Sequence, residues 1–140
     1  MARRLLVAMF LAAATGWGAD PAQEAWELLT QMASALSERN PEAFLDAFDQ
    51  RMPGYARLRE DITALLRNAE VQSAVELESD EGDSRSRVME LDWLLRIRPE
   101  SDATASTRRE QRVKCRLEKT GRKWRVVSFE PLALFAAPGA

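Results

Sequence analysis

The hydrophobic period of this sequence changes once, near Ala69, and that change constrains the fold more than any other feature. Before Ala69, apolar residues recur every three or four positions, which predicts helices. After it they alternate with polar residues, which predicts strands that each bury one face. Helices followed by a run of strands favour an α+β fold, with the helices packed on one face of an antiparallel sheet.

Three N-terminal helices are predicted before the change. Asp20-Pro21 is an N-cap followed by proline at the first helical position, and Gln23 stands where a capping box needs it. The apolar stripe of this helix consists of Trp26, Leu29, Ala33 and Leu36, flanked by Leu28 and Met32. Asn40-Pro41 repeats the cap signal before a short second helix. Pro53-Gly54 breaks the chain, and a third helix runs from Tyr55 to about Asn68.

Four strands are predicted after the change. The first places Val71, Ser73, Val75 and Leu77 on its buried face, and residues 79–84 form a turn. The second buries its odd-numbered positions from Arg87 to Ile97, and residues 99–105 form a loop. The third buries Val113, Cys115 and Leu117, and a tight hairpin at residues 119–122 leads into the fourth, residues 123–129. The strands follow one another as an antiparallel meander of four strands or more.

The N-terminus has the layout of a secretory signal peptide, predicted for residues 1–19. Arg3 and Arg4 precede the apolar run from Leu5 to Ala14, and small residues follow it, so cleavage is expected after Gly18 or Ala19. The apolar run is about half the roughly 20 residues that span a membrane, so no stable membrane anchor is expected after cleavage. The protein is therefore predicted to be exported, periplasmic or extracellular, with one domain over residues 20–135 and a disordered tail over residues 136–140.

Two features of the composition limit the chemistry. The chain has no histidine, which excludes Ser-His-Asp triads, Cys-His pairs and almost every transition-metal site. No catalytic residue set, no metal and no cofactor are therefore predicted. The single cysteine, Cys115, shares its strand face with Val113 and Leu117, so it is expected to be a buried, unreactive thiol.

The order of elements, the Asn40–Phe44 step between the first two helices and the closing hairpin Gly121–Phe129 resemble the nuclear transport factor 2-like superfamily. This superfamily includes the SnoaL-like and ketosteroid-isomerase-like families, and the resemblance covers nearly all of residues 20–135. It implies a cone, in which a bent sheet wraps the first helix and a pocket opens at the wide end. It also implies a homodimer through the sheet. Members include enzymes and non-catalytic modules, so the fold does not decide the function.

Strand parity gives candidate pocket residues. On the third strand the buried side continues back to Gln111 and Arg109, so both are expected to face the concave side, where a guanidinium can bind a carboxylate. The alternative is that the strand frays there and Arg109 reaches solvent. Four further residues either line an apolar pocket or belong to the plain core: Trp26, Tyr55, Met89 and Trp93.

Catalytic candidates are weak. Asp46 could serve as a base and Tyr55 as a hydrogen-bond donor, but Asp46 lies on a different helix side from Phe44 and Phe48, where exposure is the default. A histidine-based dehydratase site is excluded, and no ketosteroid-isomerase residue can be carried over to this chain.

Basic residues bunch on the third strand, but no nucleic-acid partner is expected. The chain has a formal net charge of −2, and no aromatic residues alternate with Arg108, Arg112, Lys114 and Arg116.

Three functions remain open from the sequence. The first is an exported, non-catalytic binding or accessory module whose cone holds a small apolar or amphipathic ligand. The second is a structural or protein-interaction partner in the cell envelope. The third is a cofactor-free isomerase or lyase that uses Asp46 and Tyr55.

Overall fold

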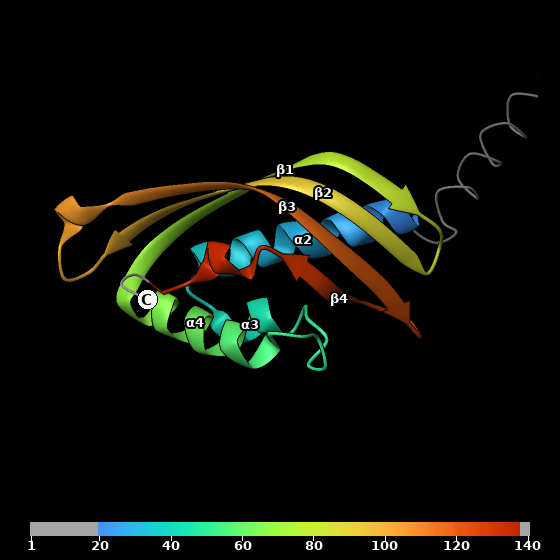
Figure 1. The fold of residues 1–140 in the computed structure, drawn as a ribbon, viewed down its shortest axis with the longest axis horizontal. Helices are drawn as coiled ribbons and strands as arrows, with labels where there is room; N and C mark the ends of the chain where they lie inside the picture. Colours follow the sequence, from blue (N-terminus) through green and yellow to red (C-terminus); the bar gives the residue numbers. More distant parts are fainter. Residues whose placement is uncertain (1–19, 138–140) are drawn as a thin grey trace, which may run out of the picture.

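The computed structural model describes residues 20–137 and confirms the α+β prediction (Figure 1). Three helices, α2 (Pro21–Ser37), α3 (Pro41–Leu45) and α4 (Tyr55–Asn68), lie on one side of a curved antiparallel sheet. The sheet consists of β1 (Ala69–Gly82), β2 (Ser86–Pro99), β3 (Thr107–Thr120) and β4 (Lys123–Glu130) in the order β1-β2-β3-β4. The strands arch over α2, so the helix-facing side of the sheet is concave.

Parts of the predicted domain division lie outside the described residues. These are the whole predicted signal peptide, residues 1–19, and residues 138–140 of the predicted tail. Within residues 20–137, no helix is long and apolar enough to cross a membrane.

The first two helices begin as the sequence predicts. Asp20 Oδ1 accepts a hydrogen bond from the Ala22 amide at 3.4 Å, and Asn40 Oδ1 accepts one from the Ala43 amide at 3.1 Å. The capping box is not formed, because the Gln23 amide points along the helix and donates to Glu27 at 3.5 Å.

The buried stripe of α2 is shifted at its N-terminal end from the one predicted. The buried residues are Ala25, Leu29, Met32, Ala33, Ala35 and Leu36, and Trp26 is only half-buried. Ala25 lies within the core, and the larger Trp26 packs at its margin.

The β1–β2 hairpin is longer than predicted. Strand β1 continues through the expected turn to Gly82, and a bulge between Leu77 and Ser79 shifts its register. The extra residue reverses the parity of the strand, so Asp80 lies opposite the buried Met89. Asp80 Oδ1 accepts a 2.8 Å hydrogen bond from Arg87 Nε, and both side chains are only 12% exposed, so the concave side carries an ion pair near this turn.

The chain after β4 returns beneath the sheet instead of extending its edge. It forms a short 3-10 helix, η2 (Leu132–Phe135), in which Leu134 and Phe135 are buried. The loop between α3 and α4 in turn covers part of the β4 edge. The Asp49 amide donates to the Val126 carbonyl at 2.9 Å, and the Val126 amide donates to the Ala47 carbonyl at 2.8 Å.

Candidate functional site

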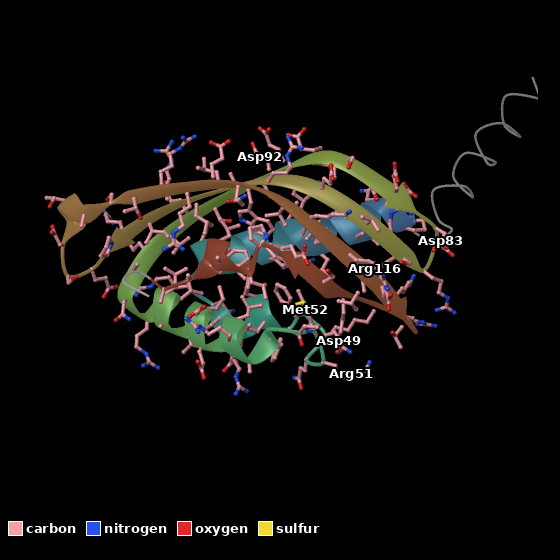
Figure 2. All side chains as sticks on the ribbon, in the orientation of Figure 1. Asp49, Arg51, Met52, Asp83, Asp92 and Arg116 are labelled. Atoms are coloured by element: carbon pink, nitrogen blue, oxygen red, sulfur yellow. The ribbon has the colours of Figure 1, made fainter. Side chains whose placement is uncertain are left out.

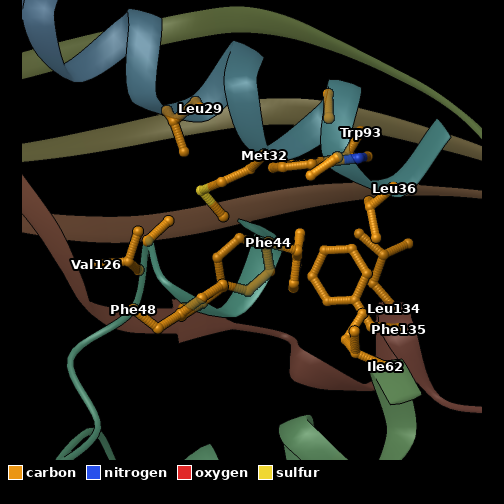
Figure 3. Close-up of a cluster of buried hydrophobic side chains, with 14 of the residues drawn as sticks. Leu29, Met32, Leu36, Phe44, Phe48, Ile62, Trp93, Val126, Leu134 and Phe135 are labelled. Carbon is orange, nitrogen blue, oxygen red and sulfur yellow. The ribbon is translucent and has the colours of Figure 1, made fainter. Parts of the chain in front are cut away.

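The inside of the cone is filled by aromatic side chains (Figure 3). The ring of Phe44 lies 5.0 Å from that of Phe135, and the ring of Trp93 lies 5.6 Å from Phe135 and 5.8 Å from Phe129. All four side chains are at most 3% exposed. Within residues 20–137 no polar or charged residue is buried, so the centre of the cone is a hydrophobic core.

Two of the predicted pocket residues belong to this core. Met89 and Trp93 are both 0% exposed. The one polar group of the Trp93 side chain has a hydrogen-bond partner, because the indole Nε1 donates to the Ser73 hydroxyl at 2.8 Å. Trp26 and Tyr55 are half-buried and pack against the core from its margin.

Arg109 lies on the concave side, where strand parity places it, but its guanidinium is already engaged. One terminal nitrogen donates to the carbonyls of Leu134 at 2.8 Å and Ala136 at 2.7 Å. Partial burial lowers the pKa of Arg109, although an arginine stays charged at neutral pH. The charge therefore holds the C-terminal turn, including Ala136 of the predicted tail, against the sheet.

Gln111 lies directly opposite Trp93 in the register of β2 and β3, yet it is exposed. Strand β4 pairs with β3 only from Lys114 onward, so no neighbouring strand covers this part of β3. Gln111 and Arg109 thus lie at the rim of the concave side.

The two weak catalytic candidates, Asp46 and Tyr55, line one surface groove of about 690 Å³. Asp46 Oδ2 lies 3.1 Å from Lys123 Nζ, and the Asp46 side chain is 69% exposed. The Asp46 carboxylate is open to solvent and paired with an ammonium group, so the groove does not hold it as a positioned general base.

A second surface groove, of about 760 Å³, lies where the α3–α4 loop meets β4. Its floor is apolar and consists of Met52, Phe129 and Leu132, and its rim carries Arg51, Arg116, Glu118 and Glu130. Figure 2 shows Asp49, Arg51 and Met52 on the loop, with Arg116 facing them from the sheet. Asp49 and Arg51 line both this groove and the one beside Tyr55, and we call the two together the loop grooves.

Sequence reasoning missed the loop grooves, because they arise only when the loop docks on β4. The one sequence signal was the chain break at Pro53-Gly54. Gly54 has φ 85°, and a Cβ there would lie 2.7 Å from a Leu132 side-chain carbon. The left-handed backbone therefore favours glycine at the point where the loop approaches Leu132.

Asp49 is fixed in its charged form. The Arg51 side chain and then the Arg51 backbone amide, which donates to Asp49 Oδ1 at 2.8 Å, hold the pKa of Asp49 below its ordinary value. A carboxylate whose pKa is lowered in this way stays ionised near neutral pH. It contributes a constant negative charge between the loop grooves.

Cys115 is buried as predicted. Burial, together with the negative charge of Asp80, raises the pKa of its thiol to about 12. The thiolate needed for nucleophilic chemistry is therefore scarce at neutral pH.

Three carboxylates gather on the outer face of the sheet, away from the helices. Oxygen atoms of Glu76, Glu78 and Asp92 lie within 4.8 Å of one another, and Figure 2 shows Asp92 pointing outward. Arg112 lies 3.9 Å from Glu78. Exposed acidic groups of this kind are common without a bound ion, and we assign no metal site here.

No family model matches the sequence, and no curated protein matches it significantly. Solved structures do resemble the fold. A conserved protein from Planctomyces limnophilus is 7% identical, with a TM-score of 0.68 over 75% of this chain and 89% of that one. A nuclear transport factor 2-like superfamily protein from Salmonella enterica is 14% identical, with a TM-score of 0.61 over 76% of this chain and 86% of that one.

A nuclear transport factor 2-like protein of unknown function from Shewanella oneidensis is 11% identical, with a TM-score of 0.60 over 79% of this chain and 97% of that one. Likeness at such low identity concerns the fold alone. The helices, the curved four-stranded sheet and these neighbours together show that the chain has the nuclear transport factor 2-like cone fold that its sequence resembles.

Proposed function

We propose that this protein is a non-catalytic interaction module that works outside the cytoplasm and binds a partner protein at its surface. The observation that carries the proposal is the filled cone. A small-molecule or catalytic site inside the cone needs free space and a few polar groups aimed into it. Phe44, Trp93 and Phe135 occupy that space instead, and no polar residue among those described is buried beside them.

The loop grooves supply the surface for such a partner. An apolar floor with a charged, solvent-exposed rim is the usual arrangement of a protein–protein contact. Here Met52 and Phe129 form part of the floor, while the rim carries both arginines and carboxylates. Such a rim favours a partner with matching opposite charges and disfavours others.

The predicted signal peptide supports the location. The test is the intact mass of the protein recovered from the envelope and medium of its own host. We expect a chain that begins at Ala19 or Asp20, as cleavage after Gly18 or Ala19 requires. A cytoplasmic protein that retains Met1 to Ala19 would contradict export.

The same preparation tests the homodimer predicted through the sheet. Native mass spectrometry is expected to give twice the mass of the mature chain. A monomer at micromolar concentration would contradict the dimer but leave the surface interaction open.

The closed cone is tested by fluorescence titration with a panel of lipids, steroids and aromatic acids. The wild-type protein is expected to show no saturable quench of tryptophan emission. The Phe44→Ala variant titrated with benzene is the matched control, since removing a buried phenyl ring is expected to leave an apolar cavity of about that size. Saturable binding of a panel member by the wild type would favour the small-ligand function over the one proposed.

The surface site is tested by a photoreactive amino acid at position 51 in intact cells. The Arg51 side chain is 91% exposed, so substitution leaves the fold intact. We expect one discrete crosslinked species, which the Leu132→Asp change in the groove floor abolishes. Position 57 is the control, because Arg57 is 69% exposed and also pairs with an aspartate but lies on α4 outside the loop grooves. Equal crosslinking from positions 51 and 57 would overturn the assignment.

A further inference from the structure

A third groove lies on the outer face of the sheet, beside the loop that joins β2 to β3. Its volume is about 400 Å³, and it shares no lining residue with the loop grooves. Gln72, Arg96 and Arg108 form one row across β1, β2 and β3, because the register pairs Gln72 with Arg96 and Arg96 with Arg108. We call it the arginine groove, and its polar lining is Glu70, Gln72, Arg96, Arg98, Ser106, Thr107 and Arg108.

The charges in the arginine groove are not balanced. The lining of the groove contains three guanidinium groups but one carboxylate, Glu70. Arg98 forms an ion pair with Glu70. Arg108 Nη2 lies 3.0 Å from Glu110 in an exposed pair, which contributes little because water screens it. Within residues 20–137, Arg96 takes part in no ion pair.

The like-charged pair is placed where it costs stability. Arg96 and Arg108 are directly opposite each other on neighbouring antiparallel strands, where like charges destabilise the sheet. A chain with a formal net charge of −2 thus concentrates positive charge at one hollow of its surface, and a bound anion would relieve the repulsion.

We propose that the arginine groove binds the phosphate group of a small organic phosphate. A guanidinium presents a planar fork of N–H donors that fits two phosphate oxygens at once. Directly opposite side chains start about 5 Å apart at Cβ, so the forks of Arg96 and Arg108 can reach one tetrahedral anion. A phosphate monoester carries a charge of about −1.5 to −2 at pH 7, which matches the two arginines.

The remaining lining residues fit the same ligand. The Gln72 amide adds neutral donors in the same row as Arg96 and Arg108. A water molecule occupies only about 30 Å³ of liquid, so a groove of about 400 Å³ leaves room for an organic group beside the phosphate.

The test is a titration of the wild-type protein with inorganic phosphate and with phenyl phosphate, at constant ionic strength. Binding is followed through the arginine Nε–Hε signals in nuclear magnetic resonance spectra. We expect saturable shifts at Arg96 and Arg108, with phenyl phosphate binding more tightly than inorganic phosphate. The Arg96→Ala/Arg108→Ala variant is expected to weaken binding at least about tenfold, as the loss of charge-assisted hydrogen bonds requires.

The control variant is Arg112→Ala/Lys114→Ala, which removes the same charge from the same face of β3 outside the groove. Its affinity is expected to stay within about twofold of the wild type. The Arg96→Lys/Arg108→Lys variant keeps the charge but lacks the planar guanidinium forks, so its phosphate affinity should lie between those of the two alanine variants. It also replaces the Arg96→Ala/Arg108→Ala variant in the test if that variant does not fold. The absence of saturable shifts, or equal weakening in both alanine variants, would overturn the proposal.

The source of the phosphate is distinguished with vesicles. Vesicles that contain phosphatidic acid are compared with pure phosphatidylcholine vesicles by co-sedimentation. Binding to the former that depends on Arg96 and Arg108 identifies a lipid headgroup. Saturable phenyl phosphate binding without vesicle binding identifies a free phosphate ester.

Discussion

The Trp93 indole donates a 2.8 Å hydrogen bond to the Ser73 hydroxyl, on the concave side of the β1–β2 pair. Ser73 is also tied to α2, because its backbone amide donates to the Ser37 hydroxyl at 3.2 Å. One serine thus satisfies the only polar atom of the largest buried side chain and fixes β1 to the central helix. The interior can be filled with a tryptophan here without an unsatisfied N–H group.

Ser73→Ala is expected to reduce the free energy of unfolding by about 1–3 kcal/mol, because it leaves the buried indole N–H without an acceptor. Urea denaturation followed by tryptophan fluorescence measures the change. In a Trp93→Phe background the same substitution should cost markedly less, since the N–H group is gone. Equal costs in the two backgrounds would mean that the hydrogen bond contributes no stability.

Arg109→Ala is expected to release the C-terminal turn. The substitution removes the donors to the Leu134 and Ala136 carbonyls, and we expect a loss of about 1–3 kcal/mol, together with faster amide hydrogen exchange at Ala136. Arg112→Ala is the matched control, since Arg112 is 60% exposed and lies on the outer face. It should change stability by no more than about 0.5 kcal/mol. Unchanged exchange at Ala136 in Arg109→Ala would contradict the clamp.

Glu24→Gln is expected to destabilise the protein in a pH-dependent way. Glu24 Oε1 accepts hydrogen bonds from Trp124 Nε1 at 3.0 Å and from Lys119 Nζ at 3.1 Å, and these contacts lower the pKa of Glu24 in that order of importance. A lowered folded-state pKa contributes stability above the unfolded-state value of about 4.3, and this stability is lost as the pH falls through the folded-state value.

The free energy of unfolding of Glu24→Gln should therefore lie about 1 kcal/mol below that of the wild type at pH 7, and the gap should narrow below about pH 4. Thermal unfolding across this pH range measures it. Glu27→Gln, which changes a carboxylate on the same helix without these two partners, is the control. A gap that stays constant through the acid range would show that ionisation of Glu24 does not stabilise the fold.

Cys115 is expected to resist alkylation in the native state. Burial raises the pKa of its thiol to about 12, so at pH 8 the thiolate is rare and also inaccessible. Iodoacetamide labelling followed by mass spectrometry should give no adduct on the native protein and one adduct in urea. Rapid native labelling would place the thiol at the surface and contradict this core.

The elements of the fold could be predicted because their signals are local. Asp20 and Asn40 cap helices wherever the rest of the chain lies, and the alternation of apolar residues from Ala69 onward specifies strands independently of their partners. The bulge at Glu78 escaped prediction, because one extra residue in a strand has no composition signal and reverses the parity of everything after it. Asp80 consequently faces the concave side.

The candidate site depended on contacts between distant segments. Parity placed Arg109 on the concave side, but it could not reveal that η2 would return beneath the sheet and supply carbonyl acceptors to its guanidinium. The loop grooves require the α3–α4 loop to dock on Val126, which no local pattern indicates.

The sequence by itself determined the order of helices and strands, the buried face of most strands and the absence of histidine chemistry, because capping, periodicity and composition act over a few residues. Only the tertiary structure decided whether the cone is open or filled. That outcome depends on sheet curvature and on whether Phe135 from η2 packs against both Phe44 from α3 and Trp93, which packing across the whole chain sets. Because the aromatic rings meet there, the grooves available for binding lie on the surface.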